Sequence, residues 1–513
     1  MVKFQVRVNV YIFVLAIPEE VFNMKQLNAS MAPAPTRPVR VLQFGEGNFL
    51  RAFVDYMIDI ANEKTDFNGS VVLVKPISIG TLFPAFKEQD QRYTVMLRGL
   101  VDGKPVESTR IVTSIADTVD SYREYDKYAA YAKLDTLRFI VSNTTEAGIV
   151  LDPSDKMELC PPQTYPGKLT KFLYERAVHF DYAADKGLII LPVELIDDNG
   201  IELHRCVREL AKLWNLGERF EQWLEEACVF TSTLVDRIVT GYPRGEDQAI
   251  FEKIGYEDHI LVTAEPFGLW VIESSKDISK ELPLPDCGLP VIFTDNQKPY
   301  KQRKVRILNG AHTSFVPMAF QCGYDIVLDS MNDPVIRNFM QKTLYDEVIP
   351  TLSLPKDDLM SFAEAVTGRF GNPFIRHMLL SICLNCVSKW RARCLPSLLG
   401  YVEANGKLPE HLAFSIASMM SLYRGGKIGE DGKLHCVRDG QPYELQDDAA
   451  VLQFFAETSA QSAAEQVHAF LTNEAFFGQD LTKIPGLEAF VAEALQEILD
   501  HGMKATVLRR FPA

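Results

Sequence analysis

Short, almost wholly apolar runs alternate with amphipathic stretches through the first half of the chain. Four such runs predict buried strands, at residues 39–44, 70–74, 137–141 and 187–191. Apolar residues recur at helical spacing between them, in residues 49–60, 118–133, 169–182 and 201–214. Strands that alternate with helices are typical of a parallel, doubly wound sheet. We therefore predict an α/β, Rossmann-type domain over residues 37–290.

The second half of the chain has a different pattern. After turn signals and a strand-like run at residues 290–295, nearly everything from residue 300 to 508 has a helical composition broken by prolines. One polar segment, residues 425–444, predicts a short hairpin. We expect a mainly α-helical C-terminal domain over residues 291–513, joined to the first domain by a linker near residues 274–289.

The N-terminus contains an apolar run that resembles a targeting signal. Residues 8–18 follow Lys3 and Arg7, but they are too few to span a bilayer, and two glutamates come next in place of a cleavage site. Met24 begins a more ordinary polar segment. We interpret residues 1–36 as a leader whose first part is an over-extended translation start, and we expect a cytoplasmic protein.

Composition narrows the possible partners. The chain has 53 Lys+Arg against 68 Asp+Glu, a net charge of −15, which argues against nucleic acids and anionic membranes as ligands. Nine cysteines are too sparse for a disulfide scaffold, so we expect reduced thiols. Cys383, Cys386 and Cys394 lack the fourth donor of a closed zinc site, and no metal is expected. A small-molecule ligand and a monomer or small homo-oligomer fit this composition.

Two polar segments follow predicted strands. The first, Gly45-Glu-Gly47-Asn48-Phe49-Leu-Arg51, opens a helix, where glycines and free N–H groups suit a dinucleotide pyrophosphate. Leu50 replaces the usual third glycine, so a simple tight turn explains the segment equally well. The second contains Asn143, Thr144, Thr145 and Glu146, which fit either the ligand crevice of an open sheet or a helix cap. Lys75, at the end of the second strand, favours a 2′-phosphate or is a solvated strand end.

Three polar residues in the second half could form an acid–base site. On a helix, Lys304, Asn309 and His312 fall within one arc of roughly 140°. A lysine can transfer a proton while an amide and an imidazole hydrogen-bond a substrate oxygen. A solvated helix face is the alternative interpretation.

Charged residues in apolar surroundings mark two further segments. Asp236 and Arg237 lie in a strand-like run and need partners if buried, so they form either an ion pair or part of a site. The second segment contains three basic residues, Arg369, Arg376 and His377, in an otherwise acidic chain. They form either an anion-binding site or a capped helix start with cations at the surface.

These segments, in this order, resemble those of the mannitol dehydrogenase family of polyol-specific long-chain dehydrogenases. The signature residues Lys304, Asn309 and His312, the VDRI run at 235–238 and the RFxNP run at 369–373 carry the resemblance, which extends from about residue 39 to 511. It implies a lysine general acid/base, an asparagine and a histidine that polarise the substrate oxygen, and no catalytic metal. It also implies NAD contacts from the Gly45–Arg51 turn and the Asn143–Glu146 segment.

Within the family, the chain is most similar to members that interconvert tagaturonate and altronate. The polyol-binding asparagine of the mannitol enzymes would fall at Leu195, so that contact is missing. A hexuronate carries a carboxylate, and Arg369, Arg376 and His377 are the candidates for a positive pocket that binds it. Asp236 is the fourth residue expected to bind the substrate. Two alternatives within the family remain: a reductase of fructuronate, or an enzyme that interconverts mannitol and fructose. A catalytically silent dinucleotide-binding regulator is the non-enzyme alternative, and it would not need all three signature residues.

Overall fold

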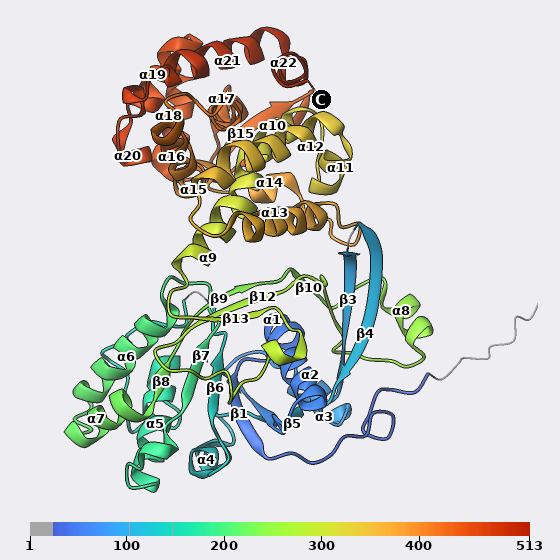
Figure 1. Cartoon of the computed structure of the whole chain (residues 1–513), viewed down its shortest axis with the longest axis vertical. Coiled ribbons are helices and arrows are strands. Elements are labelled where there is room, and N and C mark those ends of the chain that lie inside the picture. The colour runs from blue at the N-terminus through green and yellow to red at the C-terminus, as the bar shows by residue number, and fades with distance from the viewer. Residues whose placement is uncertain (1–23, 102, 146, 513) are drawn as a thin grey trace, which may run out of the picture.

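A computed structural model describes residues 24–101, 103–145 and 147–512. The predictions for residues 1–23 and for Glu146 lie outside the described residues. The chain forms two lobes: an α/β lobe of residues 24–294 and a helical lobe of residues 298–512 (Figure 1).

A six-stranded parallel sheet forms the centre of the α/β lobe within the described residues. The strand order is β5-β2-β1-β6-β7-β8, and every neighbouring pair is parallel. The strands are β1 (Val39–Phe44), β2 (Ser70–Val74), β5 (Ile115–Val119), β6 (Phe139–Ser142), β7 (Ile189–Pro192) and β8 (Val229–Phe230). The α/β, Rossmann-type fold predicted from the alternating pattern is confirmed.

Both faces of this sheet are covered, which explains why most positions of its strands are apolar and why the apolar residues do not alternate with polar ones. Alternate residues of β1 belong to different cores: Val41 packs with the first helices, whereas Leu42 packs with the later ones. The helices of this lobe are α1 (Asn48–Leu50), α2 (Tyr56–Lys64), α3 (Phe83–Glu88), α4 (Tyr125–Ala130), α5 (Tyr165–His179), α6 (Asn199–Leu213), α7 (Glu218–Ala227) and α8 (Asp247–Ile254).

The helix predicted at residues 118–133 is wrong in its first part. Residues 118 and 119 end strand β5, whose Val119 pairs with Val74 of β2, and α4 begins only at Tyr125. The β-branched residues of this stretch extend along the sheet edge, where strand pairing outweighs the helical spacing of the apolar residues.

Two smaller sheets complete the α/β lobe and were not predicted in full. One has the order β10-β11-β3-β4, and the other has the order β13-β12-β9. Their strands are β3 (Tyr93–Val101), β4 (Lys104–Val112), β9 (Ser232–Asp236), β10 (Val239–Gly241), β11 (Val262–Ala264), β12 (Leu269–Glu273) and β13 (Val291–Thr294). Strands β3 and β4 form a long hairpin that rises to the helical lobe (Figure 1), where the Asn372 amide donates to the Arg98 carbonyl (3.3 Å).

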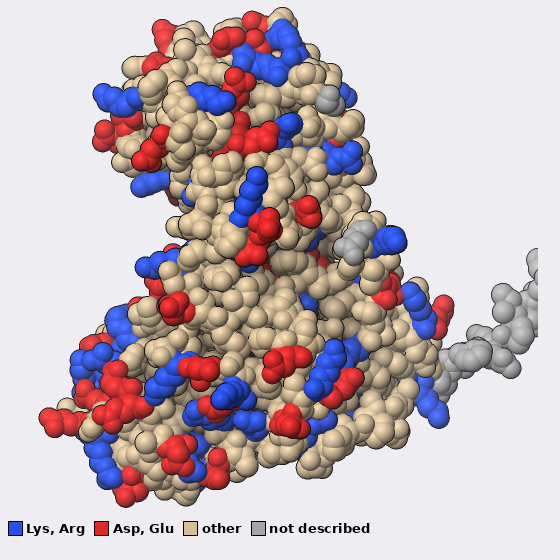
Figure 2. Space-filling view, in the orientation of Figure 1, with Lys and Arg blue, Asp and Glu red and all other residues tan. Residues whose placement is uncertain are grey.

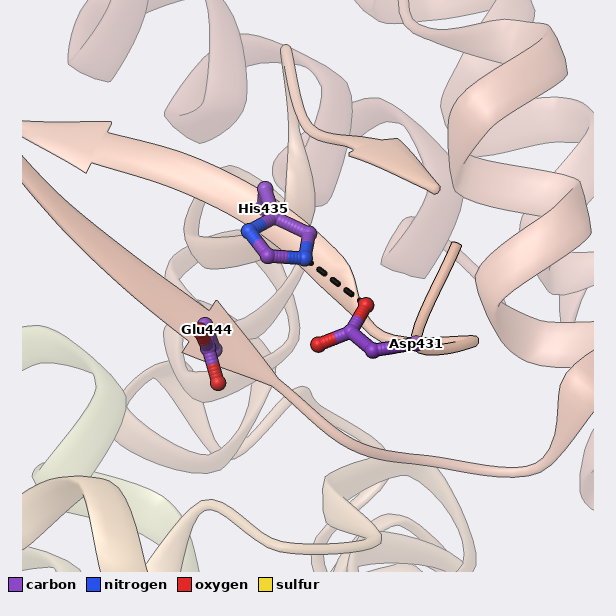
Figure 3. Close-up of side chains that lie close together, drawn as sticks. All are labelled: Asp431, His435 and Glu444. Carbon is purple, nitrogen blue, oxygen red and sulfur yellow. Dashed lines mark hydrogen bonds and ion pairs between the residues drawn. The ribbon is translucent and has the colours of Figure 1, made fainter. Parts of the chain in front are cut away.

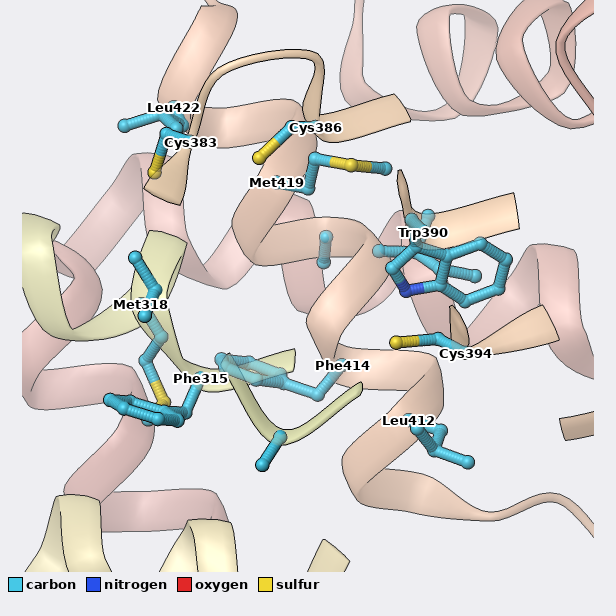
Figure 4. Packing of buried hydrophobic residues seen from close by; sticks show 14 of the residues in the cluster. Phe315, Met318, Cys383, Cys386, Trp390, Cys394, Leu412, Phe414, Met419 and Leu422 are labelled. Atoms are coloured by element: carbon cyan, nitrogen blue, oxygen red, sulfur yellow. The ribbon is translucent and has the colours of Figure 1, made fainter. Parts of the chain in front are cut away.

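The helical lobe begins with one unbroken helical segment. It consists of α9 (Lys298–Arg303), the π-helical turn η5 (Lys304–Asn309) and α10 (Gly310–Gln321). The other helices include α11 (Val327–Asn332), α12 (Pro334–Lys342), α13 (Lys356–Phe370), α14 (Leu379–Ile382), α15 (Cys386–Arg393), α16 (Leu395–Asn405), α17 (Glu410–Tyr423), α18 (Ala449–Thr458), α19 (Ala463–Leu471), α20 (Glu474–Phe477), α21 (Leu487–His501) and α22 (Met503–Arg510). They pack around one core that contains Trp390, Phe414 and Met419 (Figure 4).

The polar segment at residues 425–444 contains antiparallel strands. They are β14 (Lys427–Ile428), β15 (Leu434–Arg438) and β16 (Gln441–Leu445), in that order across the sheet.

The first described residues pack against the α/β lobe. Gln26 pairs with Glu257 and Leu27 is buried, so this part of the predicted leader packs on the α/β lobe.

Acidic and basic side chains are interspersed over the face shown in Figure 2. Among the described residues, every helix is too short or too polar to cross a membrane.

A buried carboxyl group makes the stability of the α/β lobe depend on pH. Asp55 is fully buried, one of its oxygens lacks a partner, and burial raises its pKa to about 7. The folded state therefore holds the Asp55 proton more tightly than the unfolded chain, and this contribution to stability is lost progressively as pH rises from about 4 to about 7.

We expect Asp55→Asn to remove this loss. Between pH 5 and pH 8 the free energy of unfolding of the variant should rise relative to that of the wild type by on the order of 1–3 kcal/mol. Thermal unfolding at both pH values measures the difference, with the exposed Asp66→Asn as the control. Equal pH dependence of Asp55→Asn and the wild type would contradict the assignment.

Candidate active site

The turn after β1 leaves an open backbone surface at the start of a helix. Gly45 has a φ of +126°, and a side chain there would approach Leu50 and the Asn143 carbonyl. Leu50 thus fills the space beside Gly45 where the usual third glycine is missing. Gly47 has nothing within 4 Å of where a side chain would be, and the helix that follows begins with Asn48. The turn can therefore receive a phosphate against free N–H groups.

The buried side chain of Arg51 stabilises this turn through hydrogen bonds. Its guanidinium donates to the Glu46 carbonyl (3.2 Å) and to the Asn48 side chain (2.6 Å), and it is buried. The π-helical segment Arg51–Asp55 follows directly. Arg51 acts on the shape of the turn, and its donors are already used by the protein.

The turn after β6 lies beside the first one. Asn143 donates its N–H to the Phe44 carbonyl (3.1 Å), which ties the two strand ends together. Thr145 has a φ of +72°, a strained conformation for a β-branched residue and one that is often found at functional sites. Gly148 is required here, because a side chain would lie 2.0 Å from the Thr144 hydroxyl.

Glu194 is a buried residue of this region that the sequence analysis did not single out. Its carboxylate accepts from the Thr144 N–H and hydroxyl (both 2.9 Å) and from the Ser142 hydroxyl (3.1 Å). Burial raises the pKa of Glu194. Thr144 is held by this carboxylate, whereas Asn143 and Thr145 face the cleft described below.

Lys75 does not lie at a solvated strand end. Its side chain is 6% exposed, its ammonium is 3.5 Å from Asp120, and it donates to the Ser78 carbonyl. With its charge paired, Lys75 provides no free cation for a 2′-phosphate.

Lys304 begins the π-helical turn η5 and reaches across to the α/β lobe. Its ammonium donates to the Val235 carbonyl of β9 (2.7 Å). A π-helix bonds residue i to i+5, so Lys304 and Asn309 lie on one side of the turn, and such turns are frequent at functional sites. Burial lowers the Lys304 pKa, Arg369 lowers it further, and Asp236 opposes this effect. The neighbouring Arg306 donates instead to the Ser397 hydroxyl (2.8 Å) and is not among the groups that shift the Lys304 pKa.

Asp236 pairs with Arg369 and not with its neighbour Arg237. The Arg369 guanidinium binds both Asp236 oxygens (2.9 and 3.0 Å) and both Glu265 oxygens (2.8 and 3.0 Å). Arg237 donates instead to carbonyl oxygens, including that of Ala52 (2.7 Å). The predicted Asp236–Arg237 ion pair is therefore wrong, because adjacent strand residues point to opposite faces.

The Asp236–Arg369–Glu265 cluster joins the two lobes. Arg369 belongs to α13, Asp236 ends β9 and Glu265 follows β11; their side chains are at most 6% exposed. Two carboxylates face one guanidinium, so the expected positive pocket at residues 369–377 is corrected: Arg369 has no free charge, and Arg376 is exposed.

His312 lies beside this cluster on α10. Its ring stacks on Phe370 (4.1 Å between centroids) and meets His377 edge-on (5.3 Å). Burial lowers the His312 pKa well below its ordinary value, and the charges of His377 and Arg369 add to this effect. Its Nε2 atom is buried without a partner among the described residues. The imidazole is therefore neutral and able to hydrogen-bond a ligand oxygen.

A cleft of about 540 Å³ connects several of these groups. Its lining includes Phe49, Asn143, Thr145, Val193, Leu195, Asp236 and Lys304. The cleft thus brings the Gly45–Arg51 turn, the Asn143 turn and the lysine of the helical lobe to one space. His312 and His377 form an adjoining cluster, and Arg369 acts electrostatically on both Lys304 and His312.

Among the described residues, one group of side chains could hold a metal ion, and it lies on the hairpin of the helical lobe and not in the cleft. Asp431, His435 and Glu444 lie on the exposed hairpin, with ligand atoms within 4.8 Å of one another (Figure 3). The Lys433 ammonium is 2.5 Å from Glu444 and 3.8 Å from Asp431, so a cation is already present. All nine cysteines are free thiols.

The arrangement corresponds to that of a known family. The sequence model of the mannitol dehydrogenase Rossmann domain matches residues 39–286, and that of the mannitol dehydrogenase C-terminal domain matches residues 296–499. The chain belongs to the mannitol dehydrogenase family. The resemblance drawn from the spaced motifs is thereby confirmed.

Similar members of the mannitol dehydrogenase family include altronate oxidoreductases. Those of Pectobacterium atrosepticum and Escherichia coli O1:K1 are each 47% identical to this chain, over 491 and 492 residues. Each alignment covers 94% of this chain and 99% of the relative.

Solved structures of two dehydrogenases share the fold at low sequence identity. The mannitol 2-dehydrogenase of Pseudomonas fluorescens, in complex with NAD and D-mannitol, is 21% identical with a TM-score of 0.64; 94% of this chain and 99% of that chain are covered. A substrate-free D-sorbitol dehydrogenase is 20% identical with a TM-score of 0.76, with 94% and 100% covered.

Proposed function

We propose that the protein is an NAD-dependent oxidoreductase that interconverts D-tagaturonate and D-altronate in hexuronate (galacturonate) catabolism. The observation that carries this proposal is the 47% identity to altronate oxidoreductases over 94% of the chain. Leu195 supports it, since an exposed leucine lines the cleft where the mannitol enzymes have a polyol-binding asparagine.

The residues around the two strand-end turns fit a nicotinamide dinucleotide. Gly47 leaves space for a pyrophosphate at a helix start, and Phe49, Asn143 and Thr145 line the adjoining cleft. The paired charge of Lys75 favours NAD over NADP, because an unpaired cation would be needed for the 2′-phosphate.

Lys304, Asn309 and His312 each have a separate role in the proposed reaction. When bound, the nicotinamide supplies or accepts the hydride at the substrate carbon. Lys304 gives a proton to the ketone oxygen in reduction and takes it back in oxidation. Asn309 and His312 hydrogen-bond that oxygen and stabilise its developing negative charge. The hydrogen bond from Lys304 to Val235 and the Asp236–Arg369 pair hold the lysine in the cleft.

A direct assay separates this function from its alternatives. NADH oxidation by the purified protein is measured with tagaturonate, fructuronate and fructose, and then with NADPH in place of NADH. We expect the highest kcat/KM for tagaturonate with NADH. A preference for fructuronate or fructose would reassign the substrate, and NADH binding without turnover of any ketose would indicate the silent regulator.

A further inference from the structure

Two cations on helix α15 lie side by side below the surface of the helical lobe. Lys389 and Arg393 are four residues apart, so they are neighbours on one face of the helix, and both are half-buried. Cys386 and Trp390 occupy the adjacent face and pack into the core (Figure 4). Arg391, on the same helix, is exposed.

Neither cation has a carboxylate partner among residues 24–101, 103–145 and 147–512. The Lys389 ammonium donates to the Ile382 carbonyl (3.0 Å), and the Arg393 guanidinium donates to the Thr313 hydroxyl (3.3 Å). Asp447 is near Lys389, but its carboxylate already accepts from the Tyr423 hydroxyl (2.6 Å) and the Val387 N–H (3.3 Å).

This pair costs free energy in the absence of an anion. Burial lowers the pKa of Lys389, and the neighbouring Arg393 lowers it further. Burial also lowers the pKa of Arg393. Two like charges that are partly removed from water repel each other, and a bound carboxylate would relieve that repulsion.

The pair lies next to the candidate catalytic histidine. Thr313, which accepts from Arg393, follows His312 directly on α10, and the Arg393 carbonyl lies 3.4 Å from where a side chain of Gly310 would be. Both cations contribute to the low pKa of His312. The hydrogen bond to Thr313 thus places the Arg393 guanidinium one residue along α10 from His312, whose Nε2 atom is buried without a partner among the described residues.

We propose that Lys389 and Arg393 bind the carboxylate of the sugar-acid substrate while its keto or hydroxyl oxygen lies at Lys304 and His312. The inference rests on the proposed function and names the part of the site that selects an acid over a neutral polyol. A guanidinium and an ammonium together can hold both carboxylate oxygens through charge-assisted hydrogen bonds. Arg369 cannot do this, because Asp236 and Glu265 already occupy its donors.

The test compares four single variants of the full chain with altronate and NAD as substrates. Lys389→Gln and Arg393→Gln should each raise the KM for altronate about 10- to 100-fold, with kcat changed much less. Arg391→Gln removes the same charge from the same helix and should leave KM unchanged. Lys389→Arg, which keeps the charge, should restore most of the affinity, and unchanged melting temperatures verify that the variants fold.

The outcomes distinguish the inference from the function on which it rests. If the wild type oxidises altronate and both glutamine variants keep its KM, the carboxylate site is wrong and the proposed function stands. An equal rise in KM for Arg391→Gln would reduce the effect to overall charge and overturn the site. If the wild type does not oxidise altronate, the proposed function fails, and the inference fails with it.

Discussion

Lys304→Ala is expected to lower kcat for altronate oxidation and tagaturonate reduction by at least about two orders of magnitude. The lysine ammonium is buried and lines the cleft, and the described residues of the cleft lining include no second lysine. The turn around Gly47 lies in the other lobe, so the Kd for NADH should not change. NADH fluorescence titration and steady-state kinetics measure the two effects separately.

The pH profile provides a second measurement of the same group. Reduction needs the protonated lysine, so its kcat should fall as pH rises through the lowered Lys304 pKa, which lies below the ordinary 10.5. Oxidation needs the neutral amine and should rise over the same range. Lys298→Ala, on the exposed side of α9, is the matched control and should keep both activity and profile. A Lys304→Ala enzyme with more than a tenth of wild-type turnover would refute the assignment.

Arg369→Met is expected to destabilise the protein by about 3–5 kcal/mol, because it leaves two carboxylates buried beside each other without a counter-ion. Asp236 and Glu265 are at most 6% exposed, so water cannot replace the guanidinium. Thermal or urea unfolding at pH 7 measures the loss.

Two comparisons make this experiment specific. Arg376→Met removes an exposed arginine seven residues further along the chain and should change stability by less than about 0.5 kcal/mol. Adding Asp236→Asn and Glu265→Gln to Arg369→Met removes the unpaired charges and should recover part of the loss. If Arg369→Met unfolds like the wild type, the three side chains do not hold the lobes together.

The central sheet could be predicted because burial on both faces leaves a direct signal in the sequence. Strands β1, β2, β6 and β7 are short apolar runs, and each was placed within one or two residues. The β3–β4 hairpin leaves no such signal. Its exposed strand β4 carries Lys104, Glu107 and Arg110 and pairs with β3 alone. Strand β3 in turn pairs with the distant strand β11, where Val95 lies opposite Val262.

The candidate site was predicted in part, and the part that was missed depends on contacts between residues far apart in the sequence. The spacing of Lys304, Asn309 and His312 is local to one helical segment and could be read from the sequence. The binding of Arg369 to Asp236 spans 133 residues, and that to Glu265 spans 104. Because local pattern does not encode such contacts, the free charge assigned to Arg369 was wrong. The sequence assigned no role to Lys389 and Arg393, and only their position beside α10 distinguishes them.

The groups that the proposed reaction needs are divided between the two lobes, so neither lobe alone is expected to be active. The glycine turn belongs to one lobe and the proton donor to the other, and the Lys304 ammonium is aligned by a carbonyl of the opposite lobe. Each half, produced alone, would lack one participant in the reaction however well it folded. Activity should therefore depend on how the two lobes contact each other, and we expect a change in that contact to lower turnover even when every helix and strand is intact.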